Sequence, residues 1–415
     1  MILRVDADRL RADFDALAAI GATNDHGVDR ETFSAGHLAA RAWFRERADD
    51  AGLGTRIDGA ANHSAVLPSP DPAARTLLLG SHLDSVKHGG RFDGALGVVC
   101  ALEVLRAVQD AGLELPVTLE AIDFTDEEGS LIGTLGSRAL AGQLTEHDLA
   151  APRCGREILV TELARMELTN EGIVGARRAP ASLAGYLELH VEQGPVLEQE
   201  GIDIGIVTGI VGAASLTVVF EGDARHAGTT PMEARRDAAV GAAAFVLGVR
   251  ELIVGDFAGA VATVGDVRIE PGSFNVVPGR ATLRLECRSL DAPEVESLAG
   301  ALTELAHATA KAHGLEVTIE PVGRVAPAPT AESVRAALAG AAADLGLTTM
   351  ELVSGAGHDA QSLAAITPSG MVFVPSIGGV SHDPAEETAW ADCVNGANVL
   401  LNAAVRLAED GARES

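Results

Sequence analysis

A short apolar run that ends in metal-ligand residue types constrains this chain more than any other feature. Leu77–Leu79 indicates a buried strand, and His82 and Asp84 follow it directly. A glycine-rich turn then returns Asp93 toward the same place, because glycine tolerates tight backbone turns. The apolar segment 94–108 predicts a buried helix. This order of strand, polar loop and helix predicts an α/β fold with a ligand site at the carboxyl end of the strand.

Three further predicted strands end in the same manner: Val117–Phe124, Tyr186–Leu189 and Met371–Val374. The segments that follow them hold, in turn, Glu127 and Glu128, His190, and His382. Because the carboxyl ends of parallel strands meet at one edge of a sheet, these side chains are expected to form one site. The pattern predicts a catalytic α/β domain with a mostly parallel sheet flanked by helices.

Residues 212–323 follow a different pattern. Strands are predicted at Ser215–Phe220, Ala260–Arg268, Arg280–Arg288 and Leu315–Pro321, and helices from Pro231 to near Ile253 and at Ala292–His313. The order β-α-β-β-α-β is that of a ferredoxin-like unit. We expect this unit to be inserted into a catalytic domain formed by residues 1–211 and 324–415. Within residues 5–52, which look helical, Ser34 is a suitable N-cap for Ala35–Asp50. A frayed end is expected at 409–415.

The composition excludes several classes of function. A net charge of −28 on 415 residues disfavours nucleic acid as a partner. The chain starts with no signal segment and has no uninterrupted apolar run of membrane-spanning length, which predicts a cytoplasmic protein without a membrane partner. Its four cysteines are scattered, which predicts free thiols.

Five residues at the predicted strand ends have the side chains that hold catalytic metals: His82, Asp93, Glu128, His190 and His382. Imidazole with carboxylate suits zinc, and also manganese, cobalt or nickel. Five ligands exceed one tetrahedral ion but suit two divalent ions that share a carboxylate, for which Asp93 is best placed. Asp84 is expected to fix the tautomer of His82. Glu127 is expected to act as the general base. The alternatives are a chance gathering of polar loop residues and, for Glu127, a carboxylate that only orients its neighbours.

These segments, in this order, resemble the M20 metallopeptidase family of di-zinc hydrolases. They are most similar to its amidohydrolase branch of N-carbamoyl-L-amino-acid hydrolases, β-ureidopropionases and allantoate amidohydrolases. The motifs that carry this likeness are His190-Val191-Glu192-Gln193-Gly194, Ala224 to Met232, Phe274-Asn275-Val276-Val277-Pro278-Gly279, and Ser354 to Asp359. The resemblance covers nearly the whole chain. It implies that the inserted unit is a lid that also forms a homodimer.

The resemblance implies the five ligands named above, the bridging role of Asp93 and the base role of Glu127. It also implies substrate contacts for Gln193, His226, Asn275, Arg288, Gly357 and His358. Asn275 and Arg288 would hold a substrate carboxylate, for which an Arg fork has the right geometry. His226 would stabilise the oxyanion, and Gln193 would contact the ureido group. For Arg288, pairing with an acidic neighbour is the alternative.

The resemblance, added to the predicted metal site, implies a hydrolase that cleaves the carbamoyl C–N bond of an N-carbamoyl-L-amino acid, releasing the amino acid, ammonia and carbon dioxide. Allantoate and N-acyl amino acids or dipeptides are the alternative substrates. The loop Leu131 to Leu135 departs from the branch, which usually has Arg-Phe and a longer spacer here, so the substrate stays open. A non-catalytic binding protein on the same scaffold would have lost Glu127 or a ligand, and all six residues are present.

Overall fold

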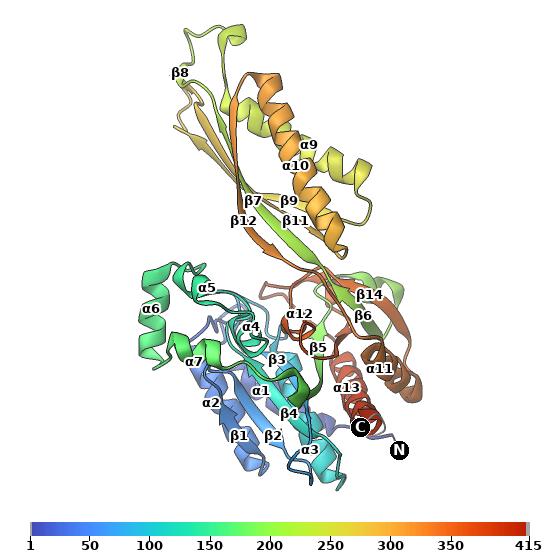
Figure 1. The fold of residues 1–415 in the computed structure, drawn as a ribbon. Coiled ribbons are helices and arrows are strands. Elements are labelled where there is room, and N and C mark those ends of the chain that lie inside the picture. Colours follow the sequence, from blue (N-terminus) through green and yellow to red (C-terminus); the bar gives the residue numbers. More distant parts are fainter. Residues whose placement is uncertain (1, 412–415) are drawn as a thin grey trace. The chain divides into compact units, whose positions relative to one another are not determined.

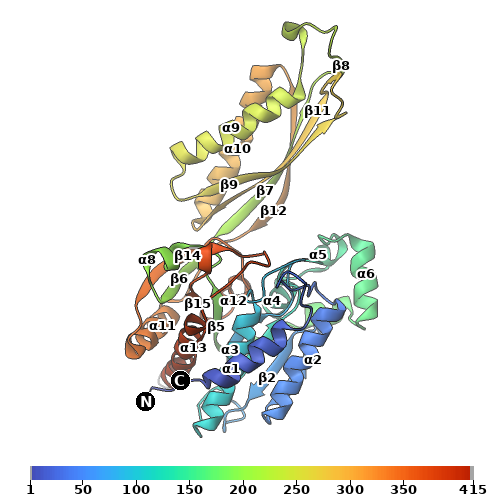
Figure 2. The same ribbon diagram turned by 180° about the vertical axis from the view of Figure 1, so that it is seen from behind.

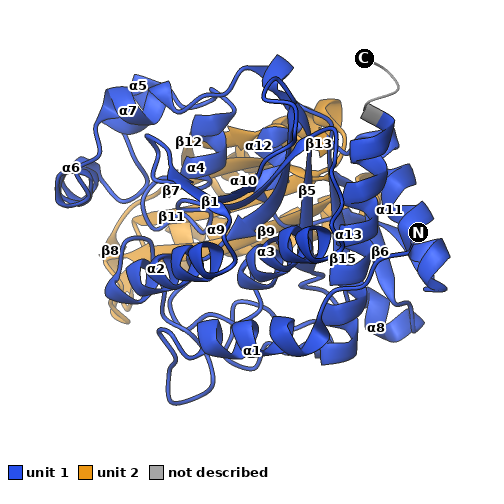
Figure 3. Ribbon diagram, turned by 90° about the horizontal axis from the view of Figure 1, so that it is seen from below, with its two compact units in different colours: residues 1–209, 329–415 blue, residues 210–328 orange. Residues whose placement is uncertain are grey.

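The computed structural model describes residues 2–411 and is shown in Figure 1. The chain divides into two compact units, which Figure 3 colours separately. The first unit runs up to Gly209 and resumes at Pro329, and the second comprises Ile210–Ala328. The second unit therefore begins two residues before, and ends five residues after, the 212–323 segment expected from the sequence.

The first unit is built on a nine-stranded sheet of order β1-β2-β4-β3-β5-β15-β6-β13, with β14 paired to β6. Its strands are β1 Gly54–Ile57, β2 His63–Leu67, β3 Thr76–His82, β4 Thr118–Phe124, β5 Leu183–Val191, β6 Ile204–Ile210, β13 Ala328–Pro329, β14 Thr349–Ser354 and β15 Ser369–Val374. The four central strands β4, β3, β5 and β15 are parallel. Strands β2 and β6 flank them antiparallel, so the sheet is mixed and parallel only at its centre.

The helices of the first unit pack on this sheet or lie beside it (Figure 1). The longer ones are α1 Ala7–Ala18, α2 Ala35–Asp50, α3 Ala95–Asp110, α6 Arg156–Arg165, α11 Glu332–Leu345 and α13 Trp390–Gly411. The shorter ones are α4 Leu135–Leu140, α5 Glu146–Ala150, α7 Asn170–Gly175, α8 Val196–Glu200 and α12 Asp359–Leu363. Every residue from Ala95 to Val108 in α3 is buried, which confirms the predicted core helix.

The helix ends follow local capping chemistry. The hydroxyl of Ser34 accepts the main-chain N–H of His37, so α2 begins where the sequence predicted it. Residues 5–52 are not one helix, because a loop at residues 19–34 separates α1 from α2. At the other end, α13 continues to Gly411 where a frayed end was expected from 409, and residues 412–415 lie outside the described part.

The second unit has the predicted β-α-β-β-α-β order. Its strands β7 Gly212–Glu221, β9 Val261–Glu270, β11 Arg280–Ser289 and β12 Glu316–Val325 form an antiparallel sheet of order β12-β7-β11-β9. Helices α9 Ala238–Asp256 and α10 Ala292–His313 cover one face of it (Figure 2). The short strands β8 Arg225–His226 and β10 Val276–Val277 pair beyond one end of the sheet.

The predicted start of α9 at Pro231 was wrong. Met232–Ala234 forms one 3₁₀ turn, and the backbone is extended at Arg235 and at Asp237. Asp237 then accepts the N–H of Ala239 and caps the helix, which begins at Ala238. The side-chain cap decides the start here, although proline is compatible with a first helical turn.

Within residues 2–411, α9 is the one helix long and apolar enough to cross a membrane by length and composition. It contains Arg250 and Glu251, and a third of the apolar window is buried. Phe245 of α9 packs edge-on against Phe220 of the sheet, with ring centroids 5.8 Å apart. Helices that cover a sheet in water-soluble domains pass the same test, so this finding is weak evidence for a membrane span.

Candidate metal centre and active site

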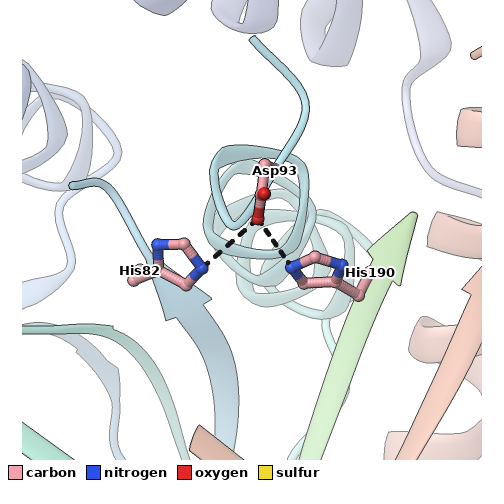
Figure 4. Close-up of side chains that lie close together, drawn as sticks. All are labelled: His82, Asp93 and His190. Carbon is pink, nitrogen blue, oxygen red and sulfur yellow. Dashed lines mark ion pairs between the residues drawn. The ribbon is translucent and has the colours of Figure 1, made fainter. Parts of the chain in front are cut away.

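The carboxyl ends of the central parallel strands bring the five predicted ligands together. His82 is the last residue of β3, and His190 lies one residue before the end of β5. Glu128 follows β4, His382 follows β15, and Asp93 precedes α3. Figure 4 shows Asp93 between the imidazole rings of His82 and His190.

Asp93 belongs to two groups of ligand atoms. Its Oδ1 lies 3.1 Å from Nε2 of His190 and 3.6 Å from Nε2 of His82. Its Oδ2 lies 3.2 Å from Nε2 of His382, which is 3.5 Å from Oε2 of Glu128. In each group of three residues the ligand atoms lie within 4.8 Å of one another. One carboxylate therefore faces both groups, as a ligand shared by two cations would.

The chemistry of the donor set fits divalent cations. Nδ1 of His82 and Nδ1 of His190 are each 2.9 Å from a main-chain carbonyl oxygen, so each ring presents Nε2 to Asp93. Burial opposes the charged form of His82, but Glu127, Asp84 and Asp93 together raise its pKa well above the ordinary value. Burial also raises the pKa of Glu128 to about 7. Buried carboxylates at this density favour a cation among them.

Asp84 orients its surroundings in two ways. The carbonyl oxygen that receives Nδ1 of His82 is the main chain of Asp84, whereas its carboxylate is 3.9 Å from that nitrogen. The carboxylate instead accepts the N–H groups of Glu127 and Glu128, at 3.3 and 3.2 Å. The tautomer of His82 is thus set by the backbone at Asp84, and its side chain positions the two glutamates.

Glu127 lies beside the ligand groups without belonging to either. Its Oε2 is 3.6 Å from Nε2 of His82, and its side chain is 11% exposed. Burial raises the pKa of Glu127 well above the ordinary value. A carboxyl group so placed can accept a proton from a water molecule at the cation groups.

Two residues that the sequence interpretation missed hold the loop after the glutamates. Asp126 is fully buried and accepts the N–H groups of Leu131, Ile132 and Gly133 at 2.7–2.9 Å. The hydroxyl of Thr32 lies 2.9 Å from Asp126 and 3.2 Å from Asp84. The loop that departs from the family pattern is therefore closed around Asp126. A positive φ of 58° at Asp126 is a structural feature that residue type alone does not reveal.

The predicted substrate residues of the first unit lie at the centre. The amide nitrogen of Gln193 donates to Asp93 Oδ2 at 2.9 Å and lies 3.1 Å from the hydroxyl of Ser381. Its Oε1 is buried without a partner among the described residues. The ring of His358, which follows Gly357, lies 4.6 Å from that of His190 and is 2% exposed. Burial lowers the pKa of His358 well below its ordinary value.

The predicted substrate residues of the second unit do not form one cluster within a chain. His226 pairs with Val276, next to Asn275, beyond the Arg280 end of β11. Arg288 lies near the other end of β11, roughly 26 Å away at about 3.3 Å per residue. Its Nε donates to Glu286 at 2.6 Å, which is the acidic pairing named as the alternative. Asn275 and Arg288 of one chain therefore cannot hold the same carboxylate.

A shared carboxylate between two imidazole-containing groups, with a further carboxylate beside them, is suited to activating water for attack on a carbonyl. This group of side chains lies at the carboxyl edge of an α/β sheet. The site and the fold together define the class of protein, which is a metal-dependent hydrolase.

Comparison with known proteins specifies the family. Residues 78–406 match peptidase family M20/M25/M40. An N-carbamoyl-L-amino acid amidohydrolase of Geobacillus stearothermophilus is 36% identical over 98% of this chain and 99% of that protein. An allantoate amidohydrolase of Bacillus subtilis is 32% identical over 94% and 95%. The crystal structure of an amidase of the hydantoinase/carbamoylase family from Burkholderia multivorans has a TM-score of 0.88 at 35% identity, over 98% of both chains. The chain belongs to peptidase family M20/M25/M40.

Proposed function

We propose that this protein hydrolyses the carbamoyl C–N bond of an N-carbamoyl-L-amino acid, releasing the amino acid, ammonia and carbon dioxide. The observation that carries the proposal is the position of Asp93 between two groups of ligand atoms, with Glu127 beside them. Nearly full-length similarity to proteins named N-carbamoyl-L-amino-acid amidohydrolases supports the choice of substrate. The cofactors in this proposal are two divalent ions, zinc first, with manganese, cobalt or nickel as alternatives.

The residues divide the chemistry between them. His82, Asp93 and His190 would hold one cation, and Asp93, Glu128 and His382 the other. Bound there, the cations would lower the pKa of a water molecule and polarise the ureido carbonyl. Glu127 would accept the proton of that water and return it to the leaving nitrogen. Gln193, already at the centre, would donate to the ureido oxygen or accept from its amide through the unpaired Oε1.

His226, Asn275 and Arg288 complete the proposal from the second unit. His226 would stabilise the developing oxyanion, and Asn275 and Arg288 would bind the substrate carboxylate. Because Asn275 and Arg288 lie at opposite ends of one sheet, two chains are needed. A two-fold homodimer would let one chain supply Arg288 and the other supply His226 and Asn275 to one substrate.

The surface of the second unit supports such a dimer. Strand β9 is at the edge of its sheet, so its outer main-chain groups are available for pairing with a second copy. Beside it, α9 exposes Leu247 by 66% and Val254 by 71%. A shallow apolar groove between α9 and β9 is lined by Val246, Leu247, Ile253, Val254 and Val261. Apolar surface of this kind marks an interface between proteins.

Leu247→Asp is expected to weaken dimerisation by about 100-fold or more, since a charge would be buried in an apolar interface. Light scattering over a concentration series measures the effect. Val322→Asp is the matched control, because Val322 is 65% exposed on β12, the opposite edge of the sheet. A dimer that survives Leu247→Asp but is lost in Val322→Asp would place the interface at β12 and contradict the proposed interface at β9.

Whether His226 acts across the dimer is tested by mixing inactive His226→Ala chains with inactive Glu127→Gln chains. Activity should return if it does, because one site of each mixed dimer then has both Glu127 and His226.

The substrate is tested by ammonia release from the metal-loaded enzyme. The panel comprises N-carbamoyl-L- and D-amino acids, N-carbamoyl-β-alanine, allantoate, N-acyl amino acids and dipeptides. Ammonia from the N-carbamoyl-L-amino acids is the expected result. Preference for allantoate is the alternative that the Bacillus subtilis relative favours. Cleavage of only acyl or peptide bonds would retain the metal centre and reject the substrate class.

We also propose a cytoplasmic location. Its support is that Cys100, Cys154, Cys287 and Cys393 are all free thiols in the structure.

A further inference from the structure

A buried carboxylate outside both ligand groups links the backbone turns that carry Asp93 and His382. Glu386 is 2% exposed, and its Oε1 accepts the N–H groups of Phe92 and Asp93 at 2.9 and 3.0 Å. Its Oε2 accepts the hydroxyl of Ser381 at 2.7 Å. A Cβ at Gly90 would lie 2.1 Å from this carboxylate, so only glycine leaves room for it there. Among residues 2–411, no basic side chain forms an ion pair with Glu386.

These contacts connect two turns of irregular backbone. One turn carries Asp93, and the other carries His382, whose φ is +56°. Oδ2 of Asp93 and Nε2 of His382, 3.2 Å apart, belong to the same ligand group. Neither turn is held by a strand or helix at these residues, so their separation depends on contacts such as those of Glu386. Ser381 strengthens the link, because its hydroxyl also lies 3.4 Å from Asp93 Oδ2.

Burial and the negative charge of Asp93 both disfavour the charged form of Glu386, while Arg30 and His382 attract it electrostatically without forming an ion pair. An apolar side chain would fill the same space at lower cost, but it would leave two N–H groups unsatisfied. What an acceptor at this position contributes is therefore the hydrogen bonds to the N–H groups of Phe92 and Asp93, and not the filling of space.

We propose that Glu386 is a positioning residue that holds Asp93 and His382 at the separation a cation needs, and thereby sets the affinity of the Asp93–Glu128–His382 group. The inference rests on the two-cation centre proposed above. Contacts around metal ligands contribute about 10–100-fold to metal affinity, which sets the size of the expected effect.

The experiment titrates metal-stripped, full-length protein with Co²⁺, followed by visible absorbance and calorimetry. In Glu386→Met the binding step at the Asp93–Glu128–His382 group should lose about 10–100-fold in affinity, more than the step at the His82–Asp93–His190 group loses. Glu386→Gln, which retains an acceptor for the N–H groups and a group for Ser381, should restore affinity to near wild type. Ser381→Ala, a milder change, should weaken the same step to a smaller extent.

Glu387→Met is the matched control, because the adjacent Glu387 pairs with Arg91 and is 46% exposed. It should leave both steps unchanged. Unchanged Co²⁺ affinity at both steps in Glu386→Met would overturn the inference. Equal losses of affinity in Glu386→Met and Glu386→Gln would also overturn it, because the charge of Glu386 rather than its hydrogen bonds would then be responsible. One Co²⁺ per wild-type chain would instead overturn the two-cation centre itself.

Discussion

Glutamine in place of Glu127 is expected to lower kcat by about 10²–10⁴-fold and to leave metal binding intact. Glutamine matches the shape of glutamate but cannot accept a proton from water. Glu127 is in neither ligand group, although its Oε2 lies 3.6 Å from His82. The main-chain bond from Glu127 to Asp84 does not involve the substituted group, so Glu128 should keep its position.

The measurement combines kcat with KM and with metal per chain by elemental mass spectrometry. Glu387→Gln is the control for a carboxylate removed close to the centre but outside it. The base role requires that kcat fall at unchanged metal content and nearly unchanged KM. If Glu127→Gln kept a tenth of wild-type kcat, Glu127 would be a residue that only orients its neighbours. If it lost a cation, Glu127 would be a ligand.

The sequence predicted the elements whose signals are local. The helix Ala35–Asp50 has a serine cap, and Ala292–His313 ends at Gly314, which adopts the left-handed conformation. The buried strands and α3 were readable from apolar runs. Strands β1 and β2 were missed, since β1 is exposed at every residue and neither is a long apolar run. Tertiary pairing, rather than local sequence, makes them strands.

The same limit applies to the site. The ligand residue types at the strand ends were sufficient to predict which side chains meet, because parallel strands share an edge. Glu386 and Asp126 were missed, since a carboxylate in a polar loop is common and the donors to these two are main-chain N–H groups, which residue type does not reveal. The separation of Asn275 and Arg288 was overlooked, although the predicted strand Arg280–Arg288 already implied it. Thirteen positions apart in the chain, they lie at opposite ends of β11 because the strand between them is extended.

Alanine in place of Asp93 is expected to abolish turnover and to weaken both cation steps, because its two oxygens face different ligand groups. His382→Ala is the informative comparison, since His382 belongs to only one group and its side chain is 52% exposed. That variant should retain one cation at wild-type affinity. Bound cations stabilise the folded state by about 2.7 kcal/mol at a concentration 100 times the Kd. The rise in Tm on adding Co²⁺ should therefore be lost in Asp93→Ala and reduced in His382→Ala.

Metal content and Tm together distinguish an Asp93 that is shared by both ligand groups from an Asp93 that serves only one of them. A shared carboxylate requires Asp93→Ala to lose both steps while His382→Ala loses one. If Asp93→Ala kept one cation at wild-type affinity, Asp93 would serve a single group. The unchanged cation would then identify the remaining ligands: His82 with His190, or Glu128 with His382. Because those pairs lie on different strands, His190→Ala made in the Asp93→Ala background would decide between them.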